Sequence, residues 1–163
     1  MMKEVSRTNW SKFCKTFNSV NQYRQINIGI YDKRNGENHV LKNSPFLGVN
    51  VHKKGRIIDG IQLFAGIWDP EKVTEPVLMI NEPLQIMVEK DKNGMDHLLK
   101  IRASDGAEAR LEIFGEKNPD YSRELIEKVA YSLYERRGYA PGNDMGDWLE
   151  AENILRKTEE QLV

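Results

Sequence analysis

The sequence predicts an α+β protein in which an N-terminal helix packs on a curved antiparallel sheet and a C-terminal antiparallel helical hairpin follows. Apolar residues recur at helical spacing in residues 9–22, at alternate positions in short segments between residues 25 and 114, and at helical spacing again after residue 121. Tight turns between the alternating segments favour antiparallel pairing over parallel crossovers. We expect about six or seven strands in residues 1–115, with residues 116–163 forming the hairpin as an appendage.

Residues 9–22 predict an amphipathic helix. Its apolar stripe consists of Trp10, Phe13, Cys14, Phe17 and Val20, and polar residues separate them. A stripe this narrow indicates a helix that lies on a sheet. Because free cysteine is among the most buried residue types, we expect the Cys14 thiol to be buried and unreactive.

Alternating apolar residues predict the strands. The segments with this pattern are residues 25–30, 39–42, 47–51, 56–64, 84–88, 99–103 and 109–113. In residues 84–88 the alternating residues are Leu84, Ile86 and Val88. Residues 66–83 contain Pro70, Pro76 and Pro83 and are expected to be irregular, although residues 77–80 also fit a buried strand.

The C-terminal residues predict two helices joined by a Gly/Pro turn. The apolar stripe of the first helix is Ile126, Val129, Ala130, Leu133 and Tyr134, and that of the second is Trp148, Ala151, Leu155 and Leu162. Gly138 is placed to end the first helix, and Asn143 or Asp144 to cap the second.

The first hairpin helix carries more apolar surface than one partner helix can cover. Tyr121, Leu125 and Tyr131 lie outside the arc that its main stripe defines. A hairpin of this size also seldom buries enough surface to be stable alone. We therefore expect it to pack on a second surface, supplied by the sheet domain or by another protein.

We expect the hairpin to contact another protein or a second copy of this chain. The candidate contact residues are Tyr121, Tyr131, Trp148 and Leu149. Residues 1–115 hold 17 Lys/Arg and 14 Asp/Glu, whereas residues 116–163 hold 7 and 11, so the two parts carry opposite net charge. The chain is therefore expected to be a non-enzymatic interaction or self-association module.

The hairpin also carries a recognisable motif. Its residues are Ala130, Tyr131, Leu133, Tyr134, Glu135, Arg137 and Gly138, then Asp147, Trp148, Leu149, Ala151 and Glu152. With them, residues 121–155 resemble a small bacterial family of unknown function patterned A-Y-x-L-aromatic-E-x-R-G and D-W-L-x-A-E. Ala140 replaces the usual proline of that family, and Gly146 stands where a charged residue is usual.

Residues 9–115 resemble a second bacterial family of unknown function. Trp10, Phe13 and Phe17, together with the Ser104-Asp105-Gly106 turn, carry this likeness. Neither resemblance implies an activity, a cofactor or a set of catalytic residues.

Two other classes of function stay open. A small-ligand site on the concave face of the sheet would be lined by Trp68 and Phe64, and an enzyme is the least favoured alternative. We expect no metal or cofactor, since the three histidines, His39, His52 and His97, lack metal-ligand spacing.

Charge and composition bear on the partners and the compartment. The net charge of −1 gives no overall attraction to nucleic acid or to an anionic membrane. The basic run at residues 52–56 is interpreted as a solvated hairpin tip, with contact to a phosphate or an acidic patch as the alternative. A single cysteine, no apolar run of signal-peptide type and no stretch long enough to cross a bilayer together predict a cytoplasmic protein.

Overall fold

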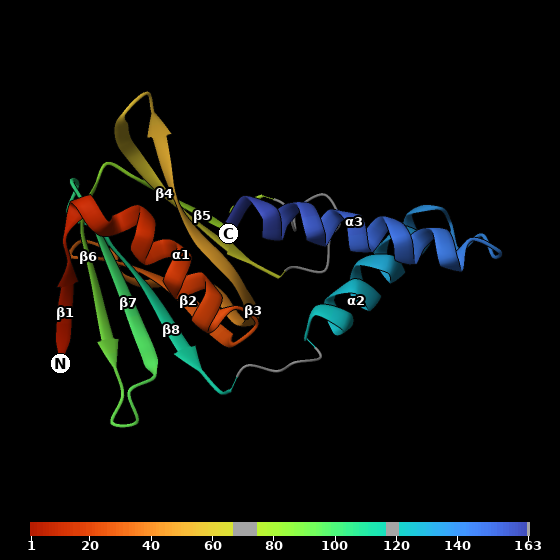
Figure 1. Cartoon of the computed structure of the whole chain (residues 1–163), viewed down its shortest axis with the longest axis horizontal. Helices are drawn as coiled ribbons and strands as arrows, with labels where there is room; N and C mark the ends of the chain where they lie inside the picture. Colours follow the sequence, from red (N-terminus) through yellow and green to blue (C-terminus); the bar gives the residue numbers. More distant parts are fainter. Residues whose placement is uncertain (67–74, 117–120, 163) are drawn as a thin grey trace.

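The computed structural model describes residues 1–66, 75–116 and 121–162, without the side chains of Tyr121, Glu159 and Gln161. Within these residues, eight strands form one antiparallel sheet, a helix packs on it, and two further helices form a hairpin beside it (Figure 1). This arrangement confirms the predicted fold class. The elements in chain order are β1 (Met2–Val5), a 3-10 turn (Arg7–Asn9), α1 (Trp10–Asn21), β2 (Gln25–Asp32), β3 (Gly36–Lys54), β4 (Ile57–Ala65), β5 (Leu78–Asn81), β6 (Pro83–Lys90), β7 (Asp96–Ala103), β8 (Glu108–Phe114), α2 (Tyr121–Arg136) and α3 (Asp144–Leu162).

The sheet curls into a half-open barrel. Its strand order is β1-β6-β7-β8-β2-β3-β4-β5, so β5 and β6 stand far apart in the order although only Glu82 separates them in the chain. The Glu82 N–H donates to the Asp59 carbonyl at 3.0 Å, and the Ser104 N–H donates to the Glu82 carbonyl at 3.0 Å. These bonds connect β4 and the end of β7 through one residue, so two strands that stand far apart in the order approach each other there.

Helix α1 fills the concave side of this sheet. Trp10, Cys14 and Phe17 are each at most 2% exposed and join the core formed by alternate residues of the strands. The Phe17 ring meets Phe46 of β3 edge-on, with ring centroids 5.6 Å apart. The predicted placement of the first helix on the apolar face of the sheet is therefore confirmed.

One buried asparagine connects three elements. Asn18 of α1 is 3% exposed; its amide nitrogen donates to the Val49 carbonyl at 2.8 Å and to the Leu162 carbonyl at 3.0 Å. Its amide oxygen accepts from the Val49 N–H at 2.7 Å. The side chain thereby satisfies the open edge of β3 and connects α1 to the end of α3.

The strand pattern differs from the expectation in three places. β1 was not predicted, because a short edge strand containing Lys3 and Glu4 lacks a periodic apolar signal. β3 is one strand of 19 residues rather than two short ones, since its first part pairs with β2 and its second part with β4. Residues 77–80, for which both an irregular segment and a buried strand were predicted, contribute a strand, β5.

Two apolar residues of the predicted periodic patterns are exposed. Val20 is 57% exposed because the core-facing side of α1 near its end carries Asn18 and Asn21, whose amides hydrogen-bond to Val49 and Asp96. Leu84 is 55% exposed, since the pairing of β6 with β7 shifts register between Pro83 and Gln85. Such a bulge interrupts the alternation on which the prediction depended.

Candidate interaction surface on the helical hairpin

The root of the hairpin packs on the sheet. A second hydrophobic cluster joins the sheet to both helices, and its buried residues are Leu47, Phe64, Leu125, Leu155 and Leu162. Leu125, which lies outside the main stripe of its helix, is fully buried in this cluster at 0% exposure. The sheet therefore supplies a surface for the root of the hairpin, and the cluster crosses the boundary between residues 1–115 and 116–163.

Two glycines allow this close approach. A Cβ atom on Gly48 of β3 would lie 2.7 Å from Leu162 Cδ1, and one on Gly66 would lie 2.6 Å from Pro45 Cγ and 3.0 Å from Leu125 Cδ1. The absence of side chains at these positions lets both helices of the hairpin rest directly against the β3–β4 region.

The turn after α2 has the hydrogen bonds of a Schellman motif. The Gly138 N–H donates to the Glu135 carbonyl at 3.0 Å, and the Tyr139 N–H donates to the Tyr134 carbonyl at 3.1 Å. Gly138 has a φ of 71°, a conformation that favours glycine. The Tyr134 and Tyr139 rings meet edge-on at 5.3 Å, which is the apolar contact that accompanies this motif.

An ion pair joins this turn to α3. Arg137 follows α2, and its guanidinium donates to the carboxylate of Asp147 in the first turn of α3. The Asp147 side chain is 6% exposed, whereas that of Arg137 is 33% exposed. The Asn143 side chain packs closely against Gly146, since its Oδ1 would lie 2.6 Å from a Cβ atom at that position. The motif residues Arg137, Gly138 and Asp147 thus fix the geometry of the turn.

The distal part of the hairpin projects away from the sheet (Figure 1). Tyr131 is 56% exposed, Leu149 52% and Met145 72%. Trp148 is half-buried, and its indole N–H donates to Glu152 Oε1 at 2.8 Å. We call Tyr131, Tyr134, Met145, Trp148 and Leu149 the distal hairpin surface.

A shallow hollow lies within this surface. It has a volume of about 420 Å³, and its lining residues include Ala130, Tyr131, Tyr134, Pro141 and Trp148. The charged residues around it are Glu127, Asp144 and Asp147, all acidic. Asp147 is paired with Arg137, and the exposed Glu127 side chain lies 3.7 Å from Arg123, so the least compensated negative charge of the rim is that of Asp144. The hollow therefore combines an aromatic wall with a negative rim.

The sequence-predicted contact residues divide by their exposure. Tyr131 and Leu149 are exposed, Trp148 is half-buried, and the side chain of Tyr121 lies outside the described residues. Met145 and Tyr139, the latter 55% exposed, extend the apolar surface but were not among the candidates. Tyr139 lies in the turn, where helical periodicity gives no signal.

Phe64, one of the two proposed ligand residues, does not belong to the core on the concave face that α1 fills. Phe64 is 4% exposed and belongs to the cluster beneath the hairpin, whereas its neighbours Leu63 and Ala65 face the core under α1. Trp68 lies outside the described residues. A ligand site beside Trp68 stays a prediction.

Two of the three histidines have acidic neighbours in the structure. His52 contacts Asp59, and His97 Nε2 lies 3.6 Å from Glu89 Oε2. Among the described residues, no three or more His, Cys, Asp or Glu side chains converge as a metal site would need. None of the helices in the described part of the chain has the length and apolar character of a membrane span.

The fold and this surface define an α+β protein in which a helical hairpin projects from a half-open antiparallel barrel. Residues 122–157 match the model of a family described as a protein of unknown function (DUF2934). The C-terminal helices are therefore similar to a family of unknown function, as their motif predicts. No curated protein and no solved structure matches the chain. The resemblance of residues 9–115 to a second family stays a prediction.

Proposed function

We propose that this chain is a protein-interaction module that associates with a second copy of itself through the distal hairpin surface. The exposure of Tyr131, Met145 and Leu149 at the projecting end of the hairpin is the observation that carries this proposal. Contiguous apolar and aromatic residues on a protein surface are typical of contact sites, and Tyr, Trp and Met are enriched in them.

The residues that line the hollow favour one kind of partner group. An aromatic wall with Glu127 and Asp144 at its rim suits an apolar side chain flanked by cations. The turn between β3 and β4 presents such a group, since Ile57 is 70% exposed and follows Lys54 and Arg56 in the chain. A second copy therefore supplies a complementary anchor.

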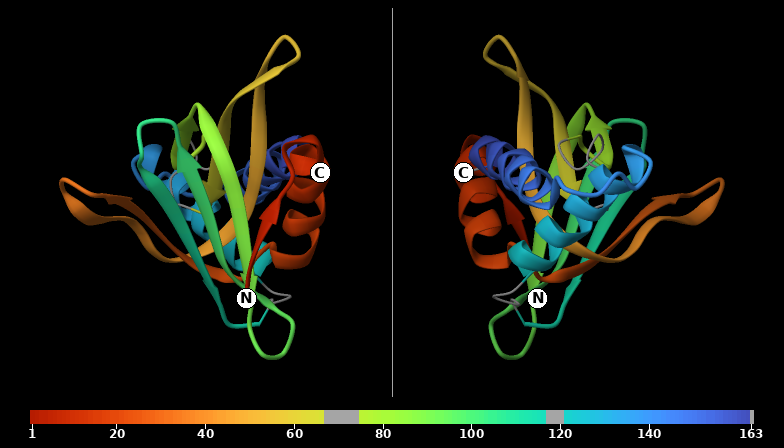
Figure 2. Two further views of the ribbon diagram at one scale, coloured as in Figure 1. Left: turned by 90° about the vertical axis from the view of Figure 1, so that its left-hand side faces the viewer. Right: turned by 90° about the vertical axis from the view of Figure 1, so that its right-hand side faces the viewer.

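The geometry favours a contact between different copies. The β3–β4 turn projects from the sheet, far from the end of the hairpin (Figures 1 and 2). A copy therefore cannot fill its own hollow with this turn. The expected contact is head-to-tail, with the β3–β4 turn of one copy in the hollow of the next.

Analytical ultracentrifugation of the full chain tests this proposal. We expect association that increases with protein concentration and weakens with added salt, because the contact pairs opposite charges. Lys54→Glu with Arg56→Glu removes the cations of the turn, and Tyr131→Lys removes part of the aromatic wall of the hollow and adds a cation that repels the turn. Each of these variants alone should be monomeric. The matched control, Lys33→Glu with Arg34→Glu on the β2–β3 turn, should associate as the unchanged protein does.

Mixing the two defective variants distinguishes the arrangements. A head-to-tail contact predicts that the mixture forms a dimer and stops there, since one variant keeps its hollow and the other keeps its turn. If Tyr131→Lys abolishes association and the turn variant does not, the hairpin contacts another surface. A chain that stays monomeric at every concentration contradicts self-association.

The proposed setting is the cytoplasm. The support for this compartment is the single cysteine of the chain, Cys14, which is buried as a free thiol.

A further inference from the structure

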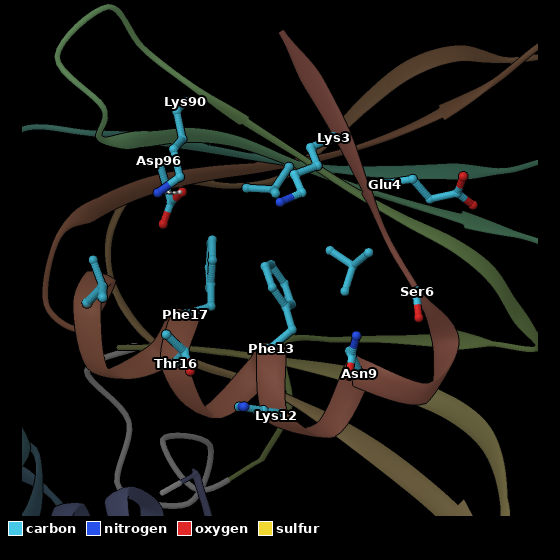
Figure 3. Close-up of a pocket in the computed structure, with 13 residues that line it drawn as sticks. Lys3, Glu4, Ser6, Asn9, Lys12, Phe13, Thr16, Phe17, Lys90 and Asp96 are labelled. Atoms are coloured by element: carbon cyan, nitrogen blue, oxygen red, sulfur yellow. Dashed lines mark ion pairs between the residues drawn. The ribbon is translucent and has the colours of Figure 1, made fainter.

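A second cavity lies between α1 and the edge of the sheet, away from the hairpin. It has a volume of about 630 Å³ and is bounded by β1, α1 and the facing ends of β6 and β7 (Figure 3). Cavities of this size hold small organic molecules in many proteins. None of its lining residues belongs to the hairpin, so its role is independent of the proposed self-association.

The wall of this cavity is apolar. Phe13 and Phe17 of α1 point into it, with their ring centroids 5.4 Å apart (Figure 3). Val20 continues this wall along the helix, and Val88 of β6 lies across from it. Val20 is 57% exposed and Phe13 is half-buried, so these two side chains present apolar surface to solvent, whereas Phe17 between them is 2% exposed and forms the floor of the cavity.

Among the residues that the structure describes, some charged groups at the cavity have hydrogen-bond or ion-pair partners and others do not. The Asp96 carboxylate accepts from the Asn21 amide at 2.8 Å, and Lys90 Nζ lies 3.5 Å from its other oxygen. The Glu4 carboxylate is turned away from the cavity, whereas the Lys3 ammonium points toward it (Figure 3). Within the described part of the chain, Lys3 has no ion-pair partner.

We propose that this cavity binds a small amphipathic carboxylate. The apolar body of the ligand lies along Phe13, Phe17 and Val20, and its carboxylate meets the ammonium of Lys3. The negative charge of Asp96 does not oppose this placement, because Asn21 and Lys90 already engage that carboxylate. A cation at one end of an apolar wall matches the two parts of such a ligand.

Titration of the full chain with decanoate, followed by NMR, tests the site. Decanol serves as the neutral probe of the same length. We expect saturable 1:1 binding of decanoate, shifts in the amide signals of α1 and β1, and binding of decanol that is weaker by about three- to tenfold. No saturable binding, or equal binding of the two probes, would overturn the proposal.

Three variants separate the charge from the apolar wall. Lys3→Gln should lower the affinity for decanoate to about that for decanol and leave decanol binding unchanged. Val20→Asp should weaken both probes, and Lys33→Gln, on the β2–β3 turn outside the cavity, should weaken neither. All three positions are solvent-exposed, so the variants are expected to fold, and their thermal unfolding checks this. Unchanged decanoate affinity in Lys3→Gln would contradict the site.

Discussion

Cys14 illustrates how burial determines the chemistry of a single residue. Its side chain is 2% exposed on the core side of α1, and desolvation raises the pKa of its thiol from 9.0 to about 12. Because the thiolate is the reactive form, we expect a disulfide reagent at pH 8 to label the native protein only as fast as it unfolds. Urea should make labelling rapid. Rapid labelling without urea would contradict the burial of this thiol.

The same pKa shift predicts how stability depends on pH. The unfolded chain releases the thiol proton above about pH 9, whereas the folded chain holds it until about pH 12. The unfolded state therefore binds fewer protons in this interval, and the contribution of Cys14 to stability falls as the pH rises through it. Cys14→Ala should show a smaller decline in urea midpoint between pH 8 and pH 10.

At the residue scale, the sequence predicted burial correctly for apolar residues whose helical spacing places them on the side of α1 that packs on the sheet. Trp10, Cys14 and Phe17 are buried as their stripe indicates. The buried positions of Asn18 and Asn21 were not predictable, because their amides bond to groups distant in sequence, at Val49 and Asp96. A polar residue that faces inward has no periodic signal until its partner is known.

At the scale of elements, the pair of Arg137 and Asp147 gives a test of the hairpin turn. Asp147→Asn keeps the shape of a side chain that is 6% exposed but removes the charge that Arg137 meets. We expect the free energy of unfolding to fall by about 1–2 kcal/mol, less than for a fully buried pair because Arg137 is partly solvated. Urea denaturation followed by circular dichroism measures this loss.

A second carboxylate on α3 provides the control. Glu160 lies 3.9 Å from Arg156, and both side chains are largely exposed. Glu160→Gln should change the free energy of unfolding by less than about 0.5 kcal/mol. Equal losses in Glu160→Gln and Asp147→Asn would show that the turn pair has no special structural role.

The hairpin elements were largely predictable, but their connection was not. Helical spacing and the Gly138 stop signal located both helices, since these signals are local. Arg137 and Asp147 are ten residues apart, a separation that no helical period brings together. The interaction of the motif residues therefore emerged only once the turn had its three-dimensional form.

At the scale of the whole molecule, two leucines of α3 report whether hairpin and sheet unfold together. Leu155 is 5% exposed in the cluster with Leu47 and Phe64, whereas Leu149 is 52% exposed. Leu155→Ala should lower the free energy of global unfolding by about 2–4 kcal/mol, because it leaves a cavity in the shared cluster. Leu149→Ala should change it by less than about 0.5 kcal/mol.

Hydrogen exchange distinguishes a shared transition from a separate one. If the cluster couples the two parts, Leu155→Ala should lower the protection of amides in β3 and β4 as well as in α2 and α3. Lower protection confined to the helices would indicate that the hairpin unfolds on its own.

The sequence showed that α2 carries more apolar surface than one partner helix can cover. It did not show which part of that surface packs on the sheet and which part stays exposed. Leu125 packs on the sheet, while Tyr131 on the same helix is open. Amphipathic spacing tells how much surface must be covered and does not tell which neighbour covers each part. The glycines at positions 48 and 66, which admit the root of the hairpin, have meaning only in the folded chain.

The strand order also has a kinetic consequence. Ile28 of β2 pairs with Leu111 of β8, across about half of the chain. During synthesis, β2 can pair with β3 early, but its other edge stays open until the ribosome has made β8. Late closure of distant strands slows folding and leaves a nascent edge able to capture other chains. This chain is therefore expected to be most prone to aggregation in the interval after β2 and β3 have been made and before β8 is available to pair.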